Sequence, residues 1–127
     1  MATMTEPDRT YNGWTNYETW NVALWIGNEQ GSYEYWEKEQ AEECYRDAVE
    51  ADEDGDRQAW TDDATERLAA RLETEFTDNQ PELSGCYADI LNAAMSEVNW
   101  HEIAENYIGE LDHDEIEKDI LPQPDGE

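Results

Sequence analysis

Residues 15–29 read TNYETWNVALWIGNE, and this stretch decides the fold class. Thr15 and Glu18 have the spacing of a capping box, which marks the start of a helix. Apolar and aromatic side chains follow on nearly every side of the helical projection, so the pattern predicts a helix over 16–29 in the middle of a bundle. A buried strand over WNVALWI is the alternative. The capping signal and the lack of a hairpin partner favour the helix.

Helical periodicity continues through the rest of the chain. Apolar side chains at helical spacing predict further helices over 33–51, 61–77, 85–98, 99–108 and a short one from 112. We therefore predict an all-α fold, a compact bundle of five to six helices with a Trp/Tyr-rich core. The side chains expected to be largely buried are Trp20, Leu24, Leu68, Leu72, Ile90, Leu91, Ile103 and Tyr107.

The length of 127 residues fits a single domain. We expect a frayed N-terminus at 1–10, one helical domain at 11–121 and a flexible tail at 122–127. The two cysteines, Cys44 and Cys86, are too few for a disulfide framework, and we expect both to be reduced core residues. No apolar run approaches the ~18 residues of a spanning helix, and the N-terminus lacks a signal peptide, so we expect a cytoplasmic protein.

The charge balance is extreme, with 34 acidic and 7 basic side chains and a formal net charge of −27. Such a chain cannot neutralise phosphates, which excludes direct nucleic-acid binding through basic patches and docking on anionic membranes. High net charge is also typical of disorder. Six Trp and seven Tyr argue against disorder, because each buried aromatic removes roughly 150–250 Å² from water.

The densest acidic track follows the predicted helix over 33–51. Like charges one helical turn apart destabilise a helix by about 0.2–0.5 kcal/mol per pair. The track therefore implies that the acids serve solubility, salt adaptation or binding. The candidate partner-binding residues are Glu39, Glu42, Glu43, Asp47, Glu50, Asp52 and Asp54. A second candidate track consists of Asp112, Asp114, Glu115, Glu117 and Asp119.

Two stretches imitate metal-binding motifs. Residues 50–55 resemble the opening of an EF-hand loop, but Thr61 occupies the place of its closing bidentate carboxylate. His101 opens an HExxH-like stretch in which Glu105 replaces the second histidine. No nucleophile has a recognisable partner and no glycine-rich phosphate loop is present. We therefore expect no enzymatic activity, no metal and no cofactor.

Two segments carry a family resemblance: YNGWTNYETWNVALWIGNEQGSY (11–33) and NAAMSEVNWHEIAENYI (92–108). Both resemble a family of small uncharacterised proteins seen in phages, plasmids and bacterial genomes. That family has no assigned activity, so the resemblance supplies no catalytic residue. It implies a mobile-element setting and a role in phage–host conflict.

Acidity on this scale suggests a DNA mimic. A domain of this size spans roughly 35 Å, and duplex DNA of that length carries about 20 phosphates, comparable to the net −24 of residues 33–127. We expect an inhibitor of restriction or CRISPR effectors whose partner is a basic nucleic-acid-binding protein of a host defence complex. The alternatives are a salt-adapted helical interaction module and a weak divalent-cation buffer. The oligomeric state stays open.

Overall fold

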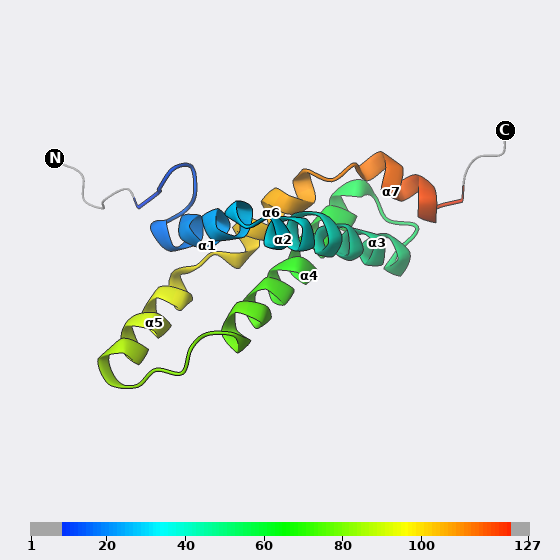
Figure 1. The fold of residues 1–127 in the computed structure, drawn as a ribbon. Helices are drawn as coiled ribbons and strands as arrows, with labels where there is room; N and C mark the ends of the chain where they lie inside the picture. The colour runs from blue at the N-terminus through cyan, green and yellow to red at the C-terminus, as the bar shows by residue number, and fades with distance from the viewer. Residues whose placement is uncertain (1–8, 123–127) are drawn as a thin grey trace.

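The computed structural model describes residues 9–122, and most of this part is helical (Figure 1). The elements are α1 (Tyr17–Asn28), α2 (Gln30–Tyr33), the π-helix η1 (Glu34–Gln40), α3 (Ala41–Ala51), α4 (Arg57–Asp78), α5 (Gly85–Glu97), α6 (Trp100–Gly109) and α7 (His113–Ile120). Because α2, η1 and α3 follow one another directly, they form one rod. The all-α prediction is confirmed: the described residues form no strand, only an isolated bridge.

The predicted ends of the chain fall largely outside the described part. Of the stretches 1–10 and 122–127, only residues 9, 10 and 122 are described. Within 9–122, no helix combines the length and the apolar character that crossing a bilayer requires.

Side-chain caps explain where several helices begin. In each case an Asn or Asp oxygen accepts a backbone N–H of the first turn, which satisfies a group that the helix itself leaves unpaired. The caps are Asn16 for α1, Asp56 for α4, Asn99 for α6 and Asp112 for α7. At α1 the cap is therefore Asn16 and not Thr15, the position that the sequence pattern indicated.

The core forms where α4 packs between α3 and α6. Leu68 and Leu72 of α4 and Ile103 and Tyr107 of α6 are buried, as predicted. They pack with further buried side chains that include Cys44, Tyr45, Val49, Ala64 and Ile108. Apolar burial of this kind stabilises the domain against the repulsion of its own charge.

The prediction that α1 lies at the centre of the bundle is wrong. Only Thr19 and Ile26 of α1 are buried, and Trp20 and Leu24 are half-buried because α1 lies along the edge of the fold. Trp25 is 67% exposed. The rings of Tyr11, Tyr17 and Trp20 pack on one another at the surface, with 4.7 Å between the Tyr11 and Trp20 centroids.

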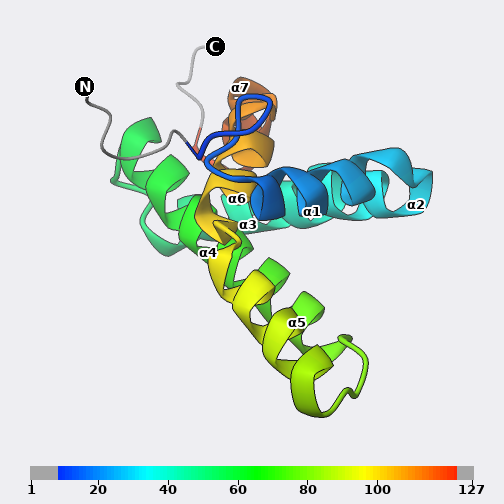
Figure 2. The ribbon, with the colours of Figure 1, turned by 90° about the vertical axis from the view of Figure 1, so that its left-hand side faces the viewer.

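Two predicted core residues of α5 also lie elsewhere. Ile90 is 60% exposed and Leu91 is half-buried, because α5 runs away from the main body (Figure 2). Cys86, on the same helix, is exposed, whereas Cys44 is fully buried as expected. Periodicity identified α5 correctly as a helix but could not show that some of its apolar side chains, such as Ile90, stay uncovered within this chain.

The π-helix η1 decides which side chain of the rod enters the core. In a regular α-helix, Glu37 would lie one turn before the buried Ala41. The wider π turn instead buries Trp36, five residues before Ala41, and leaves Glu37 half-buried at the edge. There burial and the neighbouring Glu110 carboxyl raise the pKa of Glu37 to about 7.

A pair of tryptophan substitutions tests the position of the core. Trp60 is only 6% exposed, so Trp60→Ala should lower the free energy of unfolding by about 3–5 kcal/mol. Trp25→Ala is the matched control, and it should change that energy by no more than about 0.5 kcal/mol. The free energy of unfolding of both variants is measured by urea denaturation, with far-UV circular dichroism as the probe. Equal losses for the two variants would contradict the described packing.

The position of Glu37 predicts a pH dependence of stability. Its pKa is raised on folding, so its contribution is complete below about pH 4.5 and is lost as the pH rises through about 7. Since solvent screens this half-buried group, we expect a loss of about 1–2 kcal/mol. Glu37→Gln should remove this loss, and Glu39→Gln, on the exposed side of η1, should retain it. Thermal melts between pH 4 and 8 measure the difference; identical profiles for wild type and Glu37→Gln would refute the assignment.

Candidate partner-binding surface

The predicted acidic track lies at the surface of the rod and of the loop that follows it. Five of its side chains are exposed, and Glu42 and Asp47 are half-buried. The exposed members are Glu39, Glu43, Glu50, Asp52 and Asp54. The opposite side of α3 supplies Ala41, Cys44, Tyr45, Ala48 and Val49 to the core. The helix thus presents carboxylates to solvent along its length while apolar packing fixes its backbone.

Arg71 of α4 reaches across to this track. Its Nη1 donates to Glu43 Oε1 at 2.5 Å and to Gln40 Oε1 at 2.8 Å. Its Nη2 lies 3.4 Å from Asp47 Oδ2. One guanidinium therefore holds two carboxylates of the track in fixed positions and offsets part of their mutual repulsion.

Arg46 joins the first acidic track to the second. Its Nε donates to Glu42 Oε2 within α3, and its Nη2 donates to Asp119 Oδ2 of α7, each at 2.9 Å. Both carboxylates remain partly exposed. The bridge therefore holds an acid from each track beside the other at the surface.

Arg57 fixes the start of α7 in the same manner. It pairs with Asp114, and its Nε donates to Glu117 Oε2 at 2.8 Å. Hydrogen bonding to this guanidinium lowers the pKa of both carboxyls. Tyr45 OH donates to the same Glu117 oxygen at 2.7 Å, and burial together with that carboxylate raises the pKa of the phenol.

The two tracks, predicted as alternatives, thus meet at the Arg46 bridge, and we call them together the α3–α7 face. Its members are Glu39, Glu42, Glu43, Asp47, Glu50, Asp52, Asp54, Asp112, Asp114, Glu115, Glu117 and Asp119. The helices α3 and α7 pack against each other, as Figure 1 shows. Arg46, Arg57, Arg71 and Lys118 are too few to neutralise these carboxylates, so the face stays strongly negative.

The loop between α3 and α4 is held by its main chain and does not form an EF-hand. The carbonyl oxygen of Asp52 accepts the indole N–H of Trp60 at 2.8 Å and the Gly55 N–H at 2.9 Å. A Cβ at Gly55 would lie 2.8 Å from Asp52 Oδ2, which leaves little room for a side chain there. Across residues 9–122, no group of three or more His, Cys, Asp or Glu side chains is arranged to hold a metal ion.

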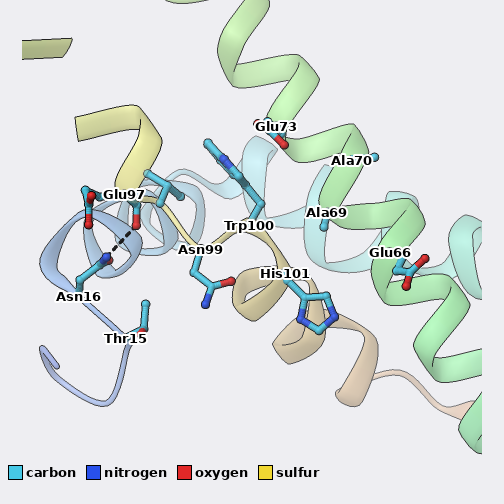
Figure 3. A pocket seen from close by; sticks show the side chains of 11 residues that line it. Thr15, Asn16, Glu66, Ala69, Ala70, Glu73, Glu97, Asn99, Trp100 and His101 are labelled. Atoms are coloured by element: carbon cyan, nitrogen blue, oxygen red, sulfur yellow. Dashed lines mark hydrogen bonds between the residues drawn. The ribbon is translucent and has the colours of Figure 1, made fainter. Parts of the chain in front are cut away.

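An open hollow of about 630 Å³ lies between the start of α1, α4 and the α5–α6 turn. His101, Glu66 and Glu73 line it (Figure 3). Glu102, the second residue of the HExxH-like stretch, accepts the Thr15 N–H at 3.0 Å. This carboxylate therefore holds α6 against the segment before α1.

Fold and surface together define a small all-α protein with one extended acidic face. The chain belongs to a family of unknown function, DUF7249, whose model matches residues 7–119. This membership agrees with the resemblance of its two segments to an uncharacterised family. The search of curated proteins and the search of solved structures each gave no match.

Removing Arg57 should loosen α7 without disturbing the core. In Arg57→Gln, amide hydrogen exchange in α7 should accelerate about two- to fivefold, the range that exposed ion pairs produce. Arg67→Gln is the control, because Arg67 pairs with Asp63 inside α4. In Arg67→Gln, the amides of α7 should exchange at the wild-type rate. Unchanged exchange in the Arg57 variant would show that α7 is held by its apolar contacts alone.

Proposed function

We propose that this protein is an acidic DNA mimic that inhibits a host defence system, of the anti-restriction or anti-CRISPR kind. It acts by occupying the basic nucleic-acid site of a defence protein, in the cytoplasm of the host of a phage or other mobile element. The mechanism requires occupancy and no catalysis. The observation that carries the proposal is the α3–α7 face, in which carboxylates from two helices are held at fixed positions.

The dimensions of the face are compatible with this role. The part of the rod that carries acids of the face, from Glu39 to Glu50, is about 17 Å long at 1.5 Å per residue. One turn of duplex DNA is about 34 Å long. Carboxylates along the rod, with those of α7 beside them, therefore extend over about half of the distance that a basic groove uses for one DNA turn.

The arginine bridges favour binding because they fix carboxylates before the partner arrives. Each of these bridges joins two helices: Arg46 and Arg57 hold acids of α7 to α3 and α4, and Arg71 of α4 holds an acid of α3. Immobilising a flexible side chain on binding costs about 0.5–1.5 kcal/mol, so acids that are already held avoid part of this cost. Several exposed acids lie outside the bridges, Glu39, Glu50 and Asp54 among them, and can meet cationic side chains of the partner.

Charge reversal tests the proposal. The triple variant Glu39→Lys, Glu50→Lys, Asp54→Lys changes exposed acids of the α3–α7 face that lie outside the arginine bridges, so it should keep the fold. The matched control is Glu66→Lys, Glu73→Lys, Glu105→Lys, with the same net charge and all three sites exposed on α4 and α6. Circular dichroism and melting temperature verify folding of both.

The binding assay uses immobilised protein and a lysate of the source cell. A retained DNA-binding protein should be displaced by a short duplex DNA, and the apparent affinity should fall steeply as salt rises. The α3–α7 variant should weaken retention at least about tenfold, a loss of about 1.4 kcal/mol, and the control should retain binding. Retention of no nucleic-acid-binding protein, or retention that duplex DNA leaves unchanged, would refute mimicry and favour salt adaptation.

A further inference from the structure

We propose that α5 is a docking surface for a second copy of this chain, with the two α5 helices packed antiparallel about a twofold axis. This proposal goes beyond the proposed function, because α5 is not part of the α3–α7 face. Dimerisation through α5 should also strengthen with salt, whereas binding of a basic partner should weaken.

No residue of α5 is buried within the chain. Tyr87 is 72% exposed and Ile90 is 60% exposed, and the helix extends away from the body in both ribbon views (Figures 1 and 2). A free helix of this length is marginal in water without an apolar surface to pack on. These exposed side chains therefore offer a surface on which another chain can pack.

The exposed apolar side chains lie on one side of the helix. Tyr87, Ile90 and Ala93 are exposed and follow one another at three-residue spacing, and Leu83, in the loop just before the helix, is exposed as well. Leu91 and Met95 are half-buried, so a different side of α5 faces the body. The outward stripe is therefore additional to the side that attaches α5 to the fold.

Charge identifies the occupant. Only two of the 34 acids, Asp89 and Glu97, fall within α5, and the helix carries no basic residue. A cationic partner would be attracted by carboxylates, so it would gain from acids at this contact. A second copy, itself at −27, is repelled by them, and depletion of acids is what a contact between two copies requires. The uncharged stretch from Ile90 to Ser96 matches the second case.

The size of the surface sets the strength of the pairing. The 13 residues of α5 extend about 20 Å. Two helices of this length bury less than the ~800 Å² per partner of a standard interface, so the dimer should be weak. Twofold symmetry places the same stripe on both copies, with Ile90 near the axis, and closes the assembly at two chains.

Sedimentation equilibrium of the whole chain tests the proposal. The average mass should rise with protein concentration from the 14.7 kDa of one chain toward twice that value. Going from low salt to 1 M NaCl should increase the dimer fraction, because salt screens repulsion between the two acidic copies. Binding of a DNA mimic to a basic partner weakens with salt, so the two proposals succeed or fail independently.

Two variants and a control locate the contact. Ile90→Glu should weaken dimerisation at least about tenfold, because it places like charges at the axis. Tyr87→Ser removes apolar area without adding charge and should weaken it in the same direction. Asn92→Glu adds the same charge about 200° around the helix from Ile90 and should leave the dimer intact. Circular dichroism verifies that each variant is folded.

A chemical readout is available in the wild-type protein. Cys86 is exposed and lies one turn before Ile90, whereas Cys44 is buried. Alkylation of Cys86 by iodoacetamide should slow as protein concentration rises. A monomer at every concentration and salt, or equal effects of Ile90→Glu and Asn92→Glu, would overturn the proposal. An alkylation rate independent of concentration would overturn the choice of face and with it the proposal.

Discussion

The hydrogen bonds between residues 15–19 and the α5–α6 turn are the contact on which the arrangement of helices depends. Thr19 is fully buried, and its Oγ1 accepts the Asn99 N–H at 2.8 Å. Asn16 Nδ2 donates to the carbonyl of Glu97 at 2.7 Å while its Oδ1 caps α1. A buried N–H without such an acceptor costs about 1–3 kcal/mol, so this junction fixes how α1 meets α6 and through α6 the core. Both halves of the junction lie within the segments 11–33 and 92–108, which carry the family resemblance.

Electrostatic repulsion is the second constraint, and a few arginines limit it. Arg46, Arg57 and Arg71 each contact at least two carboxylates, so a small number of cations acts on the most crowded acids. Two of these bridges also fasten α7, a helix of eight residues, to α3 and α4. The same contacts that make the charge tolerable therefore give the α3–α7 face its fixed shape.

The sequence predicted what depends on local spacing and missed what depends on distant neighbours. Helix positions follow from short patterns: the helices predicted over 61–77, 99–108 and from 112 correspond to α4, α6 and α7. The peripheral place of α1 and the exposure of Ile90 could not be read from periodicity, because an apolar side chain has the same pattern whether or not another helix covers it. The acidic residues were visible, but the bridges that join them involve residues up to 73 positions apart.

The π-helix has a consequence for how this chain tolerates changes in length. A π turn corresponds to one residue inserted into an α-helix. Deleting one residue within 34–40 would therefore restore regular helical geometry while the segments on either side keep their faces. In the regular turns of α3 or α4 no bulge can absorb a change of length: each residue advances an α-helix by about 100°, so a deletion there would rotate everything on one side of it out of its core contacts. Single-residue deletions should therefore be accepted in η1 as in the loop 79–84, and rejected in the buried turns of α3 and α4.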